Sequence, residues 1–190
     1  MIKQIIFEEL LTMLRKPRFL FAALVLVGLL NAQPAVAQFG NLFGSSPKVD
    51  AVSLEELKVK LETQKQKEAE AVKNGVEKPQ ADFVLVDVRS EEEVNVSIIP
   101  GAITKPEYEK DRKQYDGRTV IAYCTIGGRS AKYASELAKT GIRVKNFKGS
   151  ILEWVGAELP LVTLDGKETN KVHIYSDRYK IPSKYEAITK

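Results

Sequence analysis

Three short runs of apolar, largely β-branched residues stand out along the chain, and each predicts a β-strand. They cover residues 83–88, 120–123 and, more weakly, 144–147. A run with little polar alternation is typical of a strand that is buried on both faces, as strands are in a parallel sheet. The pattern therefore favours a parallel sheet at the centre of the molecule.

The segments between these runs have apolar residues at helical spacing. Residues 91–96 and 107–115 are short candidates, and residues 130–139 form a stronger one with Gly141 as its stop signal. The apolar face of this last helix is predicted to consist of Ala131, Ala134, Leu137 and Ala138. Strands that alternate with helices predict an α/β fold.

A further helix is predicted to begin at Ser53, ahead of the first strand. Ser53 and Glu56 have the spacing of a capping box, and the leucines within residues 54–61 share one helix face. The charged stretch that follows, near residues 62–80, has almost no apolar stripe. We interpret it as a solvated helix extension or an insert, and we assign it no function.

The N-terminal region carries the pattern of an export signal. An apolar run at residues 19–30 follows three basic residues and is too short to span a membrane comfortably. Ala35 and Ala37 form a cleavage signature with the spacing that signal peptidase favours. We therefore expect residues 1–37 to be a signal peptide, with Met13 as an alternative start of the chain.

Cleavage would leave three segments with different compositions. These are a linker at residues 38–50, a domain at 51–165 and a C-terminal extension at 166–190. The domain would face an exported compartment, either a periplasm or a thylakoid lumen. The alternative is a domain that stays tethered to a membrane because the apolar run is not removed.

Composition narrows the classes of function. The 190 residues are 44% hydrophobic and 28% charged, which suits one globular domain. The formal net charge of +4 comes from 29 basic and 25 acidic residues without a basic arm, so a nucleic-acid partner is not expected. The single cysteine, Cys124, and the single histidine, His173, exclude an intrachain disulfide and the usual zinc ligand sets. We therefore expect neither a metal nor a cofactor.

Cys124 is the candidate nucleophile because of its place in the pattern. It follows a predicted buried strand, and Gly127, Gly128, Arg129 and Ser130 lead from it into a helix. Adjacent glycines let backbone N–H groups point inward, and the helix adds the positive end of its dipole. Such a cradle and the nearby arginine favour the thiolate, so we expect a lowered pKa for Cys124.

Three motifs in order resemble the rhodanese-like sulfurtransferases. Residues 124–130, CTIGGRS, resemble the active-site loop of that family. The sequences DVR at 87–89 and IPGA at 99–102 resemble its upstream signature, and residues 148–160 resemble its closing segment. The resemblance covers about residues 53–162, which is most of the predicted mature chain.

The resemblance implies a fold and an activity. The fold would be a five-stranded parallel sheet with helices on both faces, and Cys124 would carry a persulfide between a donor and an acceptor. The implied substrate-binding residues are Thr125, Ile126, Gly127, Gly128 and Arg129, and the implied supporting residues are Asp87, Arg89 and Ser130. The donor would be a small sulfane-sulfur compound such as thiosulfate, and the acceptor would be cyanide, a thiol or a protein.

The size of the loop and two departures bear on this interpretation. Four residues separate Cys124 from Arg129, one fewer than in related phosphatases, and the narrower ring suits a bound sulfur atom. Ser97 and Ile98 stand where the family often has Gly-His, and Ser150 stands where it often has a second glycine. The alternative is a non-catalytic rhodanese-like module that binds a protein or senses oxidants.

Overall fold

The computed structural model describes residues 48–189. The chain divides into two units, Met1–Ser45 and Ser46–Lys190, and the second carries all of the described structure. The predicted signal peptide, the alternative start at Met13 and most of the predicted linker lie outside the described residues. Within residues 48–189, no helix is long and apolar enough to cross a membrane.

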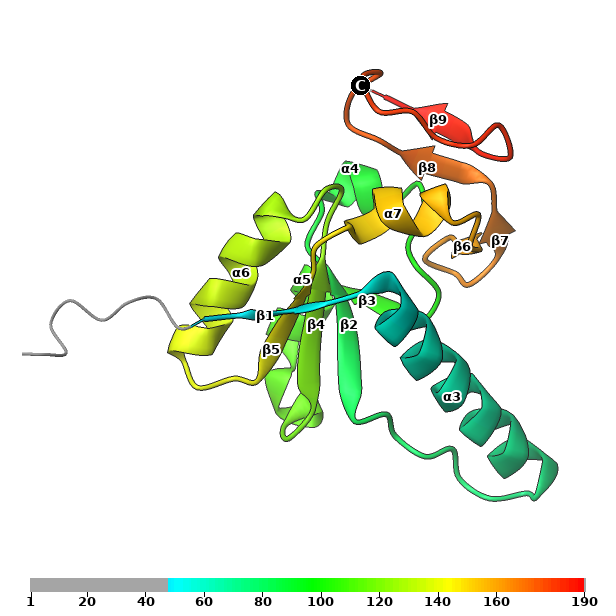
Figure 1. The fold of residues 1–190 in the computed structure, drawn as a ribbon. Coiled ribbons are helices and arrows are strands. Elements are labelled where there is room, and N and C mark those ends of the chain that lie inside the picture. Colours follow the sequence, from blue (N-terminus) through cyan, green and yellow to red (C-terminus); the bar gives the residue numbers. More distant parts are fainter. Residues whose placement is uncertain (1–47, 190) are drawn as a thin grey trace, which may run out of the picture. The chain divides into compact units, whose positions relative to one another are not determined.

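The centre of the fold is a sheet of five parallel strands, which confirms the predicted α/β class (Figure 1). The strand order is β1-β5-β4-β2-β3. The strands are β1 (Asp50–Val52), β2 (Phe83–Asp87), β3 (Ala102–Thr104), β4 (Thr119–Tyr123) and β5 (Val144–Phe147). The three predicted runs are β2, β4 and β5. The two edge strands were not predicted, and β1 includes Asp50, the last residue of the expected linker at 38–50.

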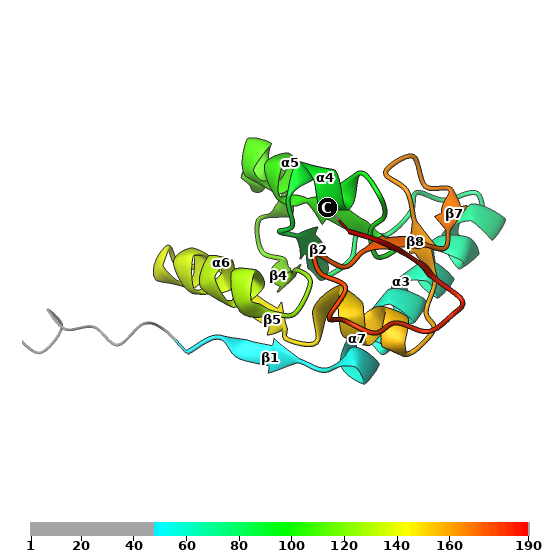
Figure 2. The same cartoon turned by 90° about the horizontal axis from the view of Figure 1, so that it is seen from above.

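Helices cover both faces of the sheet, and alternate strand residues serve the two faces (Figure 2). Phe83 and Leu85 pack toward α3 (Leu54–Lys73) and α7 (Ser150–Gly156). The opposite face of β2 packs toward α5 (Lys105–Lys110) and α6 (Gly128–Lys139). The period of two along each strand therefore places one hydrophobic cluster on each side of the sheet.

The predicted helix at Ser53 is present, but its capping box is only half formed. The Ser53 side chain accepts a hydrogen bond from the Glu56 N–H at 3.1 Å. The Glu56 carboxylate does not accept the reciprocal hydrogen bond from the Ser53 N–H. It accepts instead from Lys145 Nζ of β5 at 2.9 Å. Helix α3 then continues to Lys73, so the first part of the charged stretch is helical, and in this part only Ala71 is buried.

Two other helices differ from their predicted form. Residues 107–115 do not form one helix, because α5 ends at Lys110 and a separate 3-10 helix covers Arg112–Tyr115. In α6 the buried face includes Tyr133, Ala134 and Leu137, whereas Ala131 is exposed. The predicted apolar face of α6 is therefore wrong at Ala131, and Tyr133 belongs to the buried face instead.

The C-terminal residues form small sheets against the end of the domain. Strands β6 (Leu161–Val162) and β7 (Glu168–Thr169) are antiparallel, and β8 (Lys171–His173) and β9 (Glu186–Ile188) are parallel. Val172, Ile174 and Tyr185 join the same hydrophobic cluster as α7. Figure 1 shows β8 and β9 above α4 (Glu91–Val94) and α7, and β8 contacts α4. These strands thus pack at the end of the sheet where the chain leaves β4.

Candidate active site

The loop after β4 holds Cys124 at the carboxyl end of the central sheet. This end is where parallel α/β sheets place their ligand sites, since loops there lead into helix N-termini. Gly127 has a φ of 90°, and a Cβ at this position would lie 2.1 Å from the carbonyl oxygen of Lys148. Glycine alone adopts this φ without strain and leaves room for the Lys148 carbonyl. Gly127 therefore determines the tight turn between Cys124 and α6.

Hydrogen-bond donors surround the Cys124 sulfur. The Gly127 N–H donates to Cys124 Sγ at 3.1 Å, and the Ser130 hydroxyl lies 3.6 Å from it. Cys124 itself is only 1% exposed. Burial raises the pKa of the thiol, but the N–H groups of Ser130, Ile126 and Gly127 and the Ser130 hydroxyl together lower that pKa below its ordinary value. The loop therefore stabilises a thiolate.

Ser150 is a site residue that sequence reasoning missed. Its hydroxyl accepts from the Cys124 N–H at 3.1 Å and donates to the Phe147 carbonyl at 2.9 Å. Its Oγ lies 3.9 Å from Cys124 Sγ. Ser150 also has a φ of 56°, an uncommon conformation for a residue other than glycine. The signal was present in the sequence, because this serine stands where the family motif often has a second glycine.

Arg129, a predicted substrate-binding residue, is bound to a carboxylate. Its two terminal nitrogens donate to Glu93 Oε2 at 2.5 Å and Oε1 at 2.8 Å. The hydroxyl of Thr125 donates to Glu93 at 2.8 Å and accepts from Arg129 at 2.8 Å. The pKa of Arg129 is raised, first by the hydrogen bond to Glu93 and further by Cys124. Thr125 and Arg129 are thus held together by one carboxylate.

Glu93 is the second residue that sequence reasoning missed. It is only 1% exposed, and it also accepts from the Ser90 N–H at 3.0 Å. Burial raises its pKa, but the hydrogen bonds from Arg129, Ser90 and Thr125 prevail and lower that pKa to about 2. Glu93 is the last of three consecutive glutamates, so residue type alone does not distinguish it from the other two. The capping-box spacing from Ser90 to Glu93 would have distinguished it from its neighbours.

Asp87 and Arg89 form a buried ion pair at the end of β2. Arg89 Nη2 donates to Asp87 Oδ2 at 2.7 Å and to the Ser97 carbonyl at 2.5 Å. Burial lowers the pKa of Arg89, but the Asp87 carboxylate prevails and raises it. The guanidinium also lies 5.9 Å from the centre of the Tyr123 ring. The pair therefore ties the segment that holds Ser97 to the end of β2, beside Tyr123 of β4.

The remaining predicted loop residues differ in exposure. Ile126 is 54% exposed and forms an apolar rim beside the cysteine. Gly128 is the first residue of α6, and a Cβ there would meet nothing within 4 Å.

Among residues 48–189, no group of three or more histidine, cysteine, aspartate or glutamate side chains is placed to hold a metal ion.

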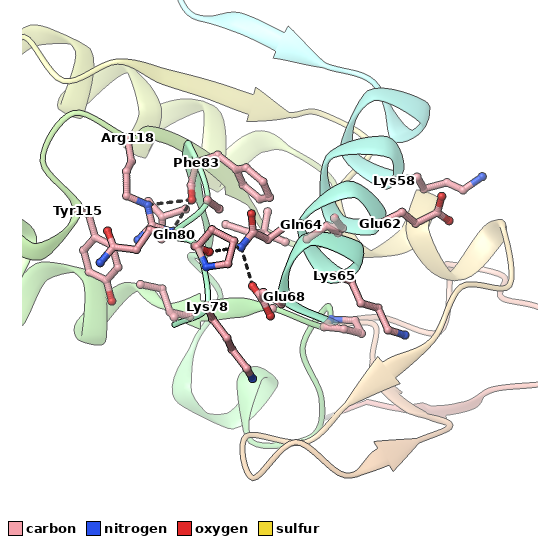
Figure 3. A pocket seen from close by; sticks show the side chains of 18 of the residues that line it. Lys58, Glu62, Gln64, Lys65, Glu68, Lys78, Gln80, Phe83, Tyr115 and Arg118 are labelled. Carbon is pink, nitrogen blue, oxygen red and sulfur yellow. Dashed lines mark hydrogen bonds between the residues drawn. The ribbon is translucent and has the colours of Figure 1, made fainter. Parts of the chain in front are cut away.

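A separate cavity of the domain does not belong to this loop. Its volume is about 630 Å³, and it lies between α3 and the start of β2. Figure 3 shows Gln64 and Glu68 of α3 on one side of it and Tyr115 and Arg118 on the other. None of residues 124–130 lines it. No cysteine lines this cavity, whereas the loop combines a nucleophile with hydrogen-bond donors to its sulfur, so the loop is the candidate active site.

Sequence comparisons relate this chain to known proteins. The model of the rhodanese-like domain matches residues 68–157. A sulfurtransferase from Allochromatium vinosum is 34% identical over 95 residues, which are 45% of this chain and 83% of that protein. A tRNA sulfurtransferase from Desulfurococcus amylolyticus is 33% identical over 73 residues, which are 38% of this chain and 15% of that protein.

Among solved structures, a thiosulfate sulfurtransferase from Pseudomonas aeruginosa has a TM-score of 0.48 and 21% identity, over 63% of this chain and 21% of that one. A rhodanese-like domain protein from Staphylococcus aureus has a TM-score of 0.41 and 28% identity, over 56% of this chain and 91% of that one. The sequence matches to the family model and to the Allochromatium protein establish the family. The chain belongs to the rhodanese-like family.

Proposed function

We propose that this protein is an exported sulfurtransferase that moves sulfane sulfur through a persulfide on Cys124. The observation that supports this most directly is the ring of donors around Cys124 Sγ, which lowers the pKa of a buried thiol. A thiolate that is held by fixed N–H groups is a nucleophile, and the same groups stabilise the persulfide anion that replaces it. Relatives named as sulfurtransferases add to this support.

In the first step, the Cys124 thiolate attacks the outer sulfur of a donor such as thiosulfate. A bond forms between Cys124 Sγ and that sulfur, and the bond from the outer sulfur to the rest of the donor breaks. Its electron pair leaves with the donor remnant, which is sulfite when thiosulfate is the donor. The Gly127 N–H, 3.1 Å from Sγ in the free protein, is placed to stabilise the new anion.

In the second step, an acceptor nucleophile attacks the outer sulfur of the persulfide. The bond between the two sulfur atoms breaks, and its electron pair returns to Cys124 as the thiolate. The chain has one cysteine, so the persulfide cannot resolve to an internal disulfide. The acceptor is therefore a second molecule, such as cyanide, a small thiol or a protein thiol.

Intact-mass measurement tests the proposal. Protein treated with thiosulfate should gain the mass of one sulfur atom, and addition of cyanide should remove it. The Cys124→Ser variant is the control and should gain nothing. If no sulfane donor loads the wild-type protein, the sulfurtransferase function is wrong, and the loop should be pursued as a protein-binding or redox-sensing module.

We propose further that the domain acts in a periplasm or a thylakoid lumen. The support is the apolar run at residues 19–30 with its basic flank and the alanine signature before Gln38. N-terminal sequencing of the protein recovered from an exported fraction should begin at Gln38. A chain that retains the apolar run in a membrane fraction would instead support the tethered form.

A further inference from the structure

A sulfurtransferase that accepts thiosulfate must bring a compact dianion to an anionic thiolate. Backbone N–H groups offset part of this repulsion, but a free cation near the thiolate offsets more of it. Arg129 is the obvious cation in the loop, yet both of its terminal nitrogens are bound to the Glu93 carboxylate. This pair is close to neutral, so a second cation is needed to attract the donor.

Arg89 does not meet that need. Its side chain is fully buried, and it is paired with Asp87 at 2.7 Å. Its second terminal nitrogen donates to that carboxylate and to the Ser97 carbonyl. A buried, paired guanidinium presents no charge to an incoming anion.

Lys148 lies directly beside the cysteine loop. A Cβ on Gly127 would come within 3.1 Å of the Lys148 Cα, so the two backbones are in contact. Gly127 is also the residue whose N–H donates to Cys124 Sγ. Lys148 is exposed, and across residues 48–189 its ammonium has no ion pair or hydrogen bond. A long, flexible side chain that starts at this point can reach the mouth of the loop.

We propose that Lys148 determines specificity for anionic donors, by attracting the sulfonate end of thiosulfate while its outer sulfur meets Cys124. This proposal rests on the proposed sulfurtransferase function. By this proposal, Arg89 and Arg129 hold the site in its arrangement. Lys148, on the turn between β5 and α7, attracts the charged donor.

The test compares two donors on the same set of variants. The first donor is thiosulfate, and the second is N-acetylcysteamine persulfide, which has no ionised group apart from its persulfide. We expect Lys148→Gln to lower kcat/KM for thiosulfate about tenfold, mainly through a higher KM, because one unit charge near the donor is lost. For the persulfide, kcat/KM should change less than about twofold.

Two further variants show whether the position or only the charge matters. Lys148→Arg should restore most of the thiosulfate activity, because it keeps the charge at the same place. Lys132→Gln removes the same charge from an exposed position on α6 and should change thiosulfate kcat/KM less than about twofold. High salt should weaken thiosulfate use by the wild-type protein more than by Lys148→Gln.

The outcomes separate this proposal from the proposed function. If the wild-type protein transfers sulfur but Lys148→Gln keeps its thiosulfate kcat/KM, the role of Lys148 is wrong and the function stands. The role of Lys148 is also wrong if Lys148→Gln lowers kcat/KM equally for both donors. It is wrong as well if Lys132→Gln lowers thiosulfate kcat/KM as much as Lys148→Gln does. If the wild-type protein takes sulfur from neither donor, the function itself is wrong.

Discussion

At the scale of single residues, the site is organised by a carboxylate that does not touch the sulfur. Glu93 accepts hydrogen bonds from Arg129, Thr125 and Ser90, and these donors belong to two separate segments of the chain. A buried carboxylate with this many donors holds both segments in one arrangement. Glu93 is therefore a positioning residue for the cysteine loop.

The first prediction concerns Glu93→Gln. The native pKa of Glu93 is about 2, well below its usual value of 4.5. Its hydrogen bonds therefore stabilise the fold fully at pH values above that usual pKa, and the stabilisation is lost as pH falls toward 2. The variant should be about 3 kcal/mol less stable than the wild-type protein at neutral pH. This difference should shrink as pH falls from about 5 to about 2.

Urea unfolding at several pH values measures this effect. Glu91→Gln is the matched control, because Glu91 is exposed on the same short helix, and it should change stability by less than about 0.5 kcal/mol. A stability difference for Glu93→Gln that stayed constant across this pH range would show that its carboxylate is not the group responsible.

At the scale of elements, the turn from β4 to α6 depends on one glycine. Gly127→Ala would place a Cβ 2.1 Å from the Lys148 carbonyl oxygen at a φ of 90°. The obstacle is backbone, so either the loop or the turn before α7 must move. We expect a loss of at least about 2 kcal/mol in unfolding free energy and at least a tenfold lower rate of persulfide formation.

Gly128→Ala is the matched control for stability. It lies next to Gly127, but its Cβ would meet nothing within 4 Å, and it begins helix α6. The substitution should leave the unfolding free energy unchanged or raise it by up to about 1 kcal/mol, because alanine favours a helix more than glycine does. Equal losses of stability for the two variants would contradict the account of the turn.

The same elements show how far the sequence predicts this fold. Strands β2 and β4 are predictable because each is buried on both faces and is a nearly unbroken apolar run. Strand β5 gives a weaker signal, because Lys145 and Asn146 interrupt it. The edge strands β1 and β3 have three residues each, and only the last residue of each is buried, so no periodicity reveals them. Their place depends on pairing with distant strands, which local pattern does not encode.

The site could likewise be predicted only where its residues are close together in the sequence. The cysteine and the two glycines form a local motif, and their chemistry follows from adjacent residues. Glu93 contacts Thr125 from 32 residues away along the chain, and Ser150 contacts Cys124 from 26 residues away. Only the folded sheet brings them to the loop. The sequence around each residue can mark it as unusual, but it does not show that the residue contacts the cysteine loop.

At the scale of the whole domain, the C-terminal strands share their core with the helix that supports the site. Val172 is fully buried, and Ile174 and Tyr185 lie in the same cluster as Trp154 and Ile151 of α7. Helix α7 begins at Ser150, whose hydroxyl accepts from the Cys124 N–H. The domain should therefore unfold as one cooperative unit, with its C-terminal strands included.

Val172→Ala tests this cooperativity, because Val172 lies in β8 and the only tryptophan of the chain, Trp154, lies in α7. The substitution should lower the unfolding free energy by about 2 kcal/mol, and tryptophan fluorescence and circular dichroism should give the same midpoint in urea. Val59→Ala removes the same atoms from a side chain that is 53% exposed and should stay within about 0.5 kcal/mol of the wild-type protein. If the midpoint by fluorescence did not move, β8 and β9 would unfold apart from α7, and their packing would not support the cysteine loop.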